Sequence, residues 1–142
     1  MRQFKHEQAT HASKATIWDI WRDVDNWPEW DIELEYATLL EDFAVGVVGT
    51  LKAKNAPESR FEITELTEGE SFTFIVRLPL ARLEIAHYFV DGEQTIFVHD
   101  VAFRGPLGWL FGMLLGQQYA TALPQAMELI QLKAEGNHKI DL

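Results

Sequence analysis

Two histidines, His87 and His99, are the side chains of this sequence best suited to acid–base chemistry, because an imidazole exchanges a proton near neutral pH. Each stands in a run that alternates apolar and polar residues, as expected of a strand with one buried face. His87 shares its face with Phe89, and His99 shares its face with Phe97. The alternation therefore predicts that both imidazoles point into the interior.

The turn between the two runs decides whether both histidines face the same way. Asp91-Gly92 predicts a hairpin at this point. A loop of about three residues would pair residue 87 with residue 97 and turn both imidazoles inward. A loop one residue shorter or longer would turn Ile96, Val98 and Asp100 inward instead.

An inward imidazole could act as a general acid or base, or could bind a carbonyl or hydroxyl group of a ligand. The alternative is a buried histidine whose ring is satisfied by a neighbouring backbone or hydroxyl group. The catalytic residues are therefore unassigned, with His87 and His99 as the candidates.

A metal site would need a third ligand, and His6 is the only other histidine predicted to point inward. The three histidines stand on separate strands without a close-spaced pair, so no metal site and no cofactor are predicted. The sequence also lacks a Ser-His-Asp arrangement, a phosphate-binding glycine loop and a dinucleotide-binding fingerprint. Hydrolase, kinase and dehydrogenase activities are therefore unsupported.

The stretch from Gly105 to Ala134 is the element that must hold these strands together. Residues 107–115 are apolar on every side, so a helix here must be enclosed. The apolar run is about half of the roughly 20 residues that span a bilayer, so protein is the expected enclosure and no stable membrane insertion is predicted. Pro124 predicts a kink or break near residues 120–123.

The elements before this helix follow from capping residues and alternation. Residues 2–11 alternate like a strand, Ser13 is expected to cap a short apolar helix, and Asn26 is expected to cap a second one. Strand-like runs then follow at residues 35–41, 47–54, 59–66, 71–78, 82–90 and 95–103. Their one-sided alternation is typical of an antiparallel meander.

The composition narrows the class of protein and its partners. The 142 residues carry a net charge of −10, which argues against nucleic acid as a partner, because phosphates need a basic patch. There is no cysteine, so disulfides and thiolate chemistry are excluded. A length of 142 residues suits one domain over residues 1–142. The first residues lack the features of a secretion signal, so we expect the protein in the bacterial cytoplasm.

Several short segments, in this order and spacing, resemble those of a known family. They are Ala15-Thr16-Ile17-Trp18 through Trp27-Pro28-Glu29-Trp30-Asp31, Gly49-Thr50-Leu51-Lys52, His99 with Phe103-Arg104-Gly105-Pro106-Leu107-Gly108, and Leu123-Pro124-Gln125-Ala126-Met127. On these residues the chain resembles the SRPBCC superfamily, which includes START and Bet v 1-like proteins, and within it the small bacterial proteins similar to polyketide cyclases and dehydrases.

The resemblance implies an α+β helix-grip fold, in which a curved antiparallel sheet of about seven strands wraps around the long C-terminal helix and two short helices follow the first strand. It also implies a deep cavity for an apolar or aromatic molecule. It implies no shared catalytic residues, because proteins of this fold differ in their chemistry.

The residues predicted to contact such a ligand come from the inward strand faces, the second short helix and the start of the long helix. They are Phe72, Phe74, Val76, His87, Phe97, His99, Trp27, Trp30, Trp109 and Met113. The three tryptophans either form the mouth of the cavity or pack between elements.

Three functions are compatible with the sequence. The first is binding or transport of an apolar small molecule such as a lipid, an isoprenoid or a polyketide-like aromatic. The second is an enzyme of the cyclase or dehydrase kind that uses His87 and His99. The third is a protein-interaction module that uses a sheet edge or the segment from Trp27 to Trp30, and the composition suits a monomer or a homodimer equally.

Overall fold

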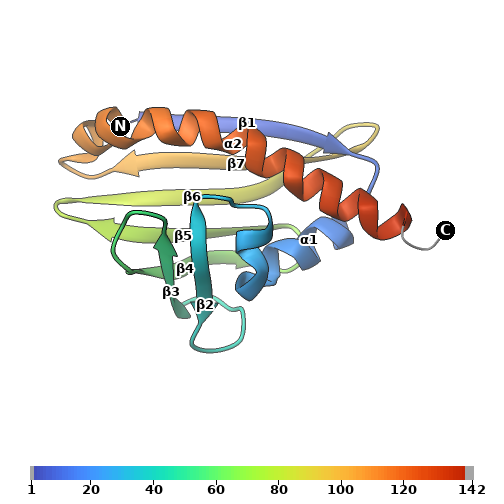
Figure 1. The fold of residues 1–142 in the computed structure, drawn as a ribbon, viewed down its shortest axis with the longest axis horizontal. Coiled ribbons are helices and arrows are strands. Elements are labelled where there is room, and N and C mark those ends of the chain that lie inside the picture. The colour runs from blue at the N-terminus through green and yellow to red at the C-terminus, as the bar shows by residue number, and fades with distance from the viewer. Residues whose placement is uncertain (1, 140–142) are drawn as a thin grey trace.

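The computed structural model describes residues 2–139, which form one antiparallel sheet with helices on one of its faces (Figure 1). The strands are β1 (Arg2–Thr10), β2 (Leu34–Leu39), β3 (Val48–Ala53), β4 (Ser59–Thr67), β5 (Ser71–Leu78), β6 (Ala81–Val90) and β7 (Thr95–Arg104). The helices are α1 (Lys14–Arg22), the 3-10 helix η1 (Val24–Glu29) and α2 (Gly108–Lys139).

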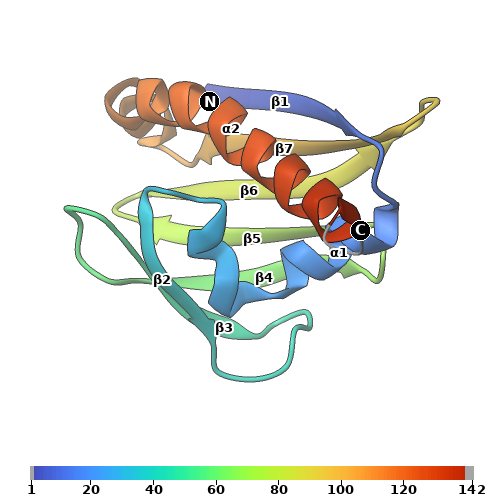
Figure 2. The same cartoon turned by 45° about the vertical axis from the view of Figure 1, so that its right-hand side comes forward.

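The sheet order is β1-β7-β6-β5-β4-β3-β2, so the first strand pairs with the last one. This is the predicted α+β helix-grip fold, with a seven-stranded curved sheet, two short helices after the first strand and a long C-terminal helix. Helix α2 runs along β1 and β7, and its C-terminal half meets α1 (Figures 1 and 2). The core therefore lies between the inner face of the sheet and the three helices.

Capping fixes the start of α1 as predicted, because the Ser13 hydroxyl accepts a hydrogen bond from the Thr16 N–H at 3.2 Å. The apolar face of α1 buries Trp18 and Trp21. The second short helix is η1, which begins at Val24, upstream of the predicted cap Asn26.

The hairpin between β6 and β7 differs from the predicted register. His87 lies opposite His99, and the last pair before the turn is Val90 with Ile96, so the predicted pairing of residue 87 with residue 97 is wrong. The turn is longer than the Asp91-Gly92 signal suggested. Because the register shift is an even number of residues, the faces are unchanged and both histidines are buried.

Helix α2 tests two predictions. Of the kink or break predicted near residues 120–123, the break is absent, because one helix continues through Pro124, and the helix changes direction along its length, as a kink would make it do (Figure 1). The enclosure expected for residues 107–115 is only partial, because Phe111 and Leu115 pack against the core while Trp109 and Met113 are more than half exposed. The sheet covers one side of this segment, where Gly116 packs against the Phe4 ring of β1. In the described residues, no helix is long and apolar enough to cross a membrane.

A close approach at Gly49 fixes the pairing of β3 with its neighbours. A Cβ atom at this position would lie 2.4 Å from the Thr38 carbonyl oxygen and 2.6 Å from the Phe61 ring. Both groups are held by the sheet, so Gly49→Ala is expected to lower the free energy of unfolding by about 2 kcal/mol. Urea denaturation followed by circular dichroism measures this.

The control for that substitution is Gly136→Ala. Gly136 lies in α2, and a Cβ there would meet no atom within 4 Å. Alanine favours a helix over glycine, so this variant is expected to be as stable as the wild type or up to about 1 kcal/mol more stable. Equal losses in the two variants would contradict the role given to Gly49.

Candidate functional site

Most of the residues predicted to contact a ligand lie together on the inner side of the sheet. The following are all buried: Phe72, Phe74, Val76, His87, Phe97, His99, Trp27 and Trp30. With Trp21 they form what we call the aromatic core. Trp109 and Met113 are separate from it, because their side chains are 54% and 53% exposed on α2.

Three imidazoles form one row across the sheet. His6 on β1 lies opposite His99 on β7, and His99 lies opposite His87 on β6. The ring centroids of His87 and His99 are 4.5 Å apart. These histidines are far apart in the sequence, and the pairing of their strands brings them next to one another. Among residues 2–139, no group of three His, Asp or Glu side chains could hold a metal ion.

Trp21 is the centre of the aromatic core, a role that the sequence analysis missed. Its ring is fully buried and lies 5.5 Å from the His87 ring and 5.8 Å from the His99 ring. The Trp21 indole N–H donates to Nε2 of His99 at 3.0 Å. An accepting Nε2 carries no proton, so His99 is neutral with its proton on Nδ1. The helical periodicity of α1 predicts that Trp21 is buried, but it does not predict which strand residues it meets.

His87 is engaged by the strand beside it. Its ring stacks on Phe72 at 4.0 Å with an interplanar angle of 6°, and Nδ1 lies 3.3 Å from the Phe72 carbonyl oxygen, so Nδ1–H donates to that oxygen. Burial lowers the pKa of His87 to about 3 and lowers the pKa of His99 well below its usual range. Both rings are therefore neutral and weakly basic at neutral pH.

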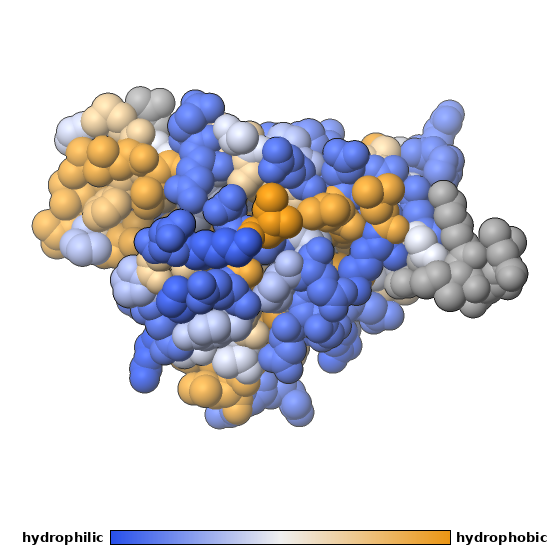
Figure 3. All heavy atoms as spheres, viewed as in Figure 1, coloured by the Kyte–Doolittle hydropathy of each residue, from blue (hydrophilic) through white to orange (hydrophobic). Residues whose placement is uncertain are grey.

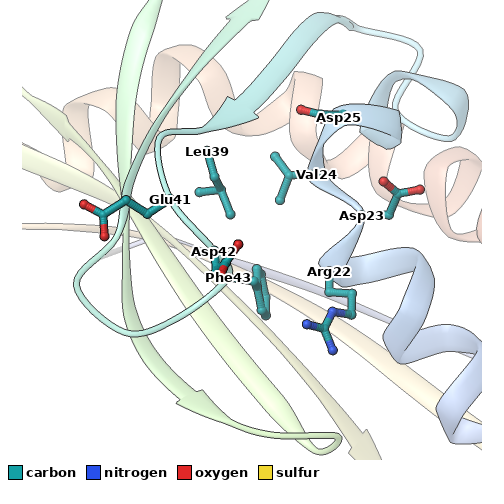
Figure 4. Close-up of a pocket in the computed structure, with 8 residues that line it drawn as sticks. All are labelled: Arg22, Asp23, Val24, Asp25, Leu39, Glu41, Asp42 and Phe43. Atoms are coloured by element: carbon teal, nitrogen blue, oxygen red, sulfur yellow. The ribbon is translucent and has the colours of Figure 1, made fainter.

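A pocket between the end of α1 and the loop after β2 lies outside the aromatic core. Its volume is about 480 Å³, and Figure 4 shows its lining residues. They are Arg22, Asp23, Val24, Asp25, Leu39, Glu41, Asp42 and Phe43. The carboxylates make this pocket acidic and hydrophilic, so it suits an apolar ligand poorly.

A smaller pocket lies between β1 and α2 and has a volume of about 130 Å³. It is lined by Phe4, Lys5, His6, Ala120, Leu123 and Pro124. Pro124 has no N–H, so the Ala120 carbonyl lacks its usual helical partner. Because His6 belongs to the histidine row, this pocket adjoins the aromatic core. A cavity of about 150 Å³ holds a benzene-sized molecule, so the pocket suits a small aromatic group.

A cluster of apolar side chains is exposed at the start of α2. Leu80, Trp109, Met113 and Leu114 are each more than half exposed. The Leu107 N–H donates to the Leu80 carbonyl at 2.9 Å, which holds the turn between β5 and β6 against α2. Figure 3 shows apolar atoms gathered over this end of the molecule. In the segment from Trp27 to Trp30, predicted as a possible protein-binding surface, both tryptophans are buried, and Glu29 is exposed.

Comparisons with known proteins agree with this architecture. The family described as "Polyketide cyclase / dehydrase and lipid transport" matches residues 1–135. A search of the curated proteins finds no match.

Solved structures show the same fold at low sequence identity. The di-domain ARO/CYC StfQ from the steffimycin biosynthetic pathway has a TM-score of 0.77 and 12% identity, over 96% of this chain and 51% of that one, so this chain spans about half of StfQ. A START superfamily protein from Mycobacterium smegmatis has a TM-score of 0.72 and 15% identity, over 96% and 99% of the two chains. Norcoclaurine synthase from Thalictrum flavum has a TM-score of 0.68 and 14% identity, over 92% and 84%.

Proposed function

The chain belongs to the polyketide cyclase / dehydrase and lipid transport family, and from that premise we propose that it binds an apolar small molecule between the sheet and α2. The observation that carries the proposal is the pocket between β1 and α2, which adjoins the aromatic core at His6. The ligand would enter beside Leu123 and Pro124 and extend toward the buried rings.

The size of the pocket limits what binds without movement. At 130 Å³ it accepts one aromatic ring or a short apolar chain without movement, and a bicyclic ligand such as tetralin requires a small displacement of α2 away from the sheet. The glycine at 116 makes α2 lie close to Phe4, so small displacements there would enlarge the pocket. Burying about 300 Å² of ligand surface would contribute roughly 7 kcal/mol before ordering costs.

Binding or transport of the ligand is better supported than catalysis by His87 and His99. A general acid or base works best when its pKa lies near the working pH. Burial holds the pKa of both His87 and His99 far below neutrality, and each ring is already hydrogen-bonded. A cyclase-type reaction that uses these two histidines would therefore need them to become hydrated when substrate binds.

Binding of tetralin, an apolar bicyclic hydrocarbon, tests the proposal. Ala120 is exposed and lines the pocket, so Ala120→Phe is expected to fill its entrance and weaken binding by about tenfold or more. Tetralin titration followed by the indole ¹H–¹⁵N signals measures this, with exposed Trp109 as an internal signal that should not shift.

Thr121→Phe is the matched control, because Thr121 is exposed on the same helix and lies outside the lining of the pocket. Its affinity for tetralin should stay within about twofold of the wild type. Absence of saturable tetralin binding to the wild type, or equal binding by the two variants, would refute the proposed site.

A further inference from the structure

One buried polar side-chain atom lacks a hydrogen-bond partner among the residues that the structure describes, and it is Nε1 of Trp30. The Trp30 side chain is 6% exposed, so bulk water does not reach it freely. Buried polar groups in native proteins are almost always paired, because an unmade hydrogen bond in the interior costs free energy. An orphaned donor of this kind points to a missing acceptor.

Three other buried donors of the aromatic core have hydrogen-bond partners. Trp21 donates to His99 at 3.0 Å, Trp27 donates to the Trp21 carbonyl at 2.8 Å, and Nδ1 of His87 faces the Phe72 carbonyl at 3.3 Å. His87 and His99 were predicted to orient a ligand, but Nδ1 of His87 and Nε2 of His99 are already hydrogen-bonded to groups of the protein. Trp30 differs from Trp21 and Trp27 because its indole N–H has no hydrogen-bond acceptor.

The Trp30 ring is held in place by the end of η1. Its backbone N–H donates to the Trp27 carbonyl at 3.1 Å, and its ring lies 5.8 Å from the His99 ring and 6.1 Å from the Trp27 ring. These contacts fix the direction of the indole N–H. The donor is therefore preorganised and does not need to be reoriented to meet an acceptor.

Trp30 does not itself line the small pocket, and two contacts link them. His6, which lines the pocket, is the cross-strand partner of His99, and the His99 ring lies 5.8 Å from the Trp30 ring, so a ligand that extends from the pocket toward the buried rings would approach Trp30. The rings around Trp30 make an apolar interior. Burying an unpaired anionic group there would cost far more free energy than burying a neutral one, so a neutral oxygen is the better acceptor.

We propose that the indole N–H of Trp30 recognises a neutral carbonyl oxygen on the apolar ligand of this chain. The inference rests on the proposed function, and it goes beyond it by assigning a specificity-determining residue and a ligand class. Ligands of this class are ketones, quinones and esters, whose carbonyl oxygen accepts a hydrogen bond without donating one.

The test compares 1-tetralone with tetralin, which differ by one carbonyl group. In the wild type, tetralone should shift the Trp30 indole proton downfield, whereas tetralin should not, and this readout needs no variant. In Trp30→Phe, the affinity for tetralone should fall by about fivefold or more, while the affinity for tetralin stays within about twofold. Trp109→Phe is the control and should change neither affinity, because Trp109 is exposed outside the core.

The outcomes separate the two proposals. If tetralin and tetralone both fail to bind the wild type, the proposed function is refuted and this inference falls with it. If both ligands bind but tetralone leaves the Trp30 signal in place and Trp30→Phe weakens both equally, the inference is overturned and the proposed function stands. Circular dichroism of each variant confirms that the fold is kept.

Discussion

Replacing Trp21 with alanine is expected to lower the free energy of unfolding by about 4 kcal/mol, because the substitution empties the centre of a close-packed core. Trp21 is fully buried and contacts rings from β5, β6 and β7. It also supplies the hydrogen bond to His99, so the variant leaves a buried acceptor unpaired. Urea denaturation followed by circular dichroism measures the loss, which is a large part of the stability of an ordinary domain.

Trp109→Ala removes the same side chain from a position that is 54% exposed. Its effect is expected to be about 0.5 kcal/mol or less, as for most surface substitutions. The difference between the two variants isolates the effect of burial from that of the residue type. Similar losses in both would show that α2 is covered in solution and that Trp21 is not the centre of the core.

Acidification is expected to weaken the fold by about 4 kcal/mol between about pH 7.5 and about pH 5. Burial lowers the pKa of His87 to about 3 and lowers that of His99 well below its usual value, so both remain neutral in the native state. In the unfolded chain each histidine takes up a proton below about pH 6.5. The unfolded state therefore binds more protons in this window, and stability falls as the pH falls.

His87→Phe is the variant that checks this assignment. Phenylalanine keeps an aromatic ring against Phe72 and removes one of the two titrating groups. The loss of stability over the same pH window should shrink to about half, because carboxylates with ordinary pKa values stay ionised there. Free energies of unfolding at several pH values give both slopes, and equal slopes for the variant and the wild type would rule out His87 as a source of the effect.

Local patterns predicted the elements of this fold closely. The alternation at residues 71–78 matches β5 at both ends, and Ser13 caps α1 as its position suggested. Alternation also predicted that His87 and His99 face inward. Both are buried although the predicted register was wrong by two residues, because a shift of two residues leaves the faces unchanged. The error arose because Asp91-Gly92 signals a turn without fixing its length.

What the sequence could not supply depends on contacts between distant segments. His6 meets His99 because β1 pairs with β7, and Trp21 meets the same histidine because α1 packs over the sheet. Neither pairing leaves a signal in spacing. The exposure of Trp109 could not be predicted from the sequence either. An apolar run indicates that burial would stabilise a helix, but it does not show whether another element covers that helix.

The pairing of β1 with β7 also affects how the chain is made. Residues 2–10 have no strand partner until residues 95–104 have been synthesised. At about 5 to 20 residues per second, the first strand waits for roughly 5 to 20 seconds with its apolar face unpaired. The sheet then closes by joining the most distant segments of the chain, which is a slow step because long loops are costly to close. Newly made chains are therefore most exposed to aggregation and to chaperones just before β7 emerges.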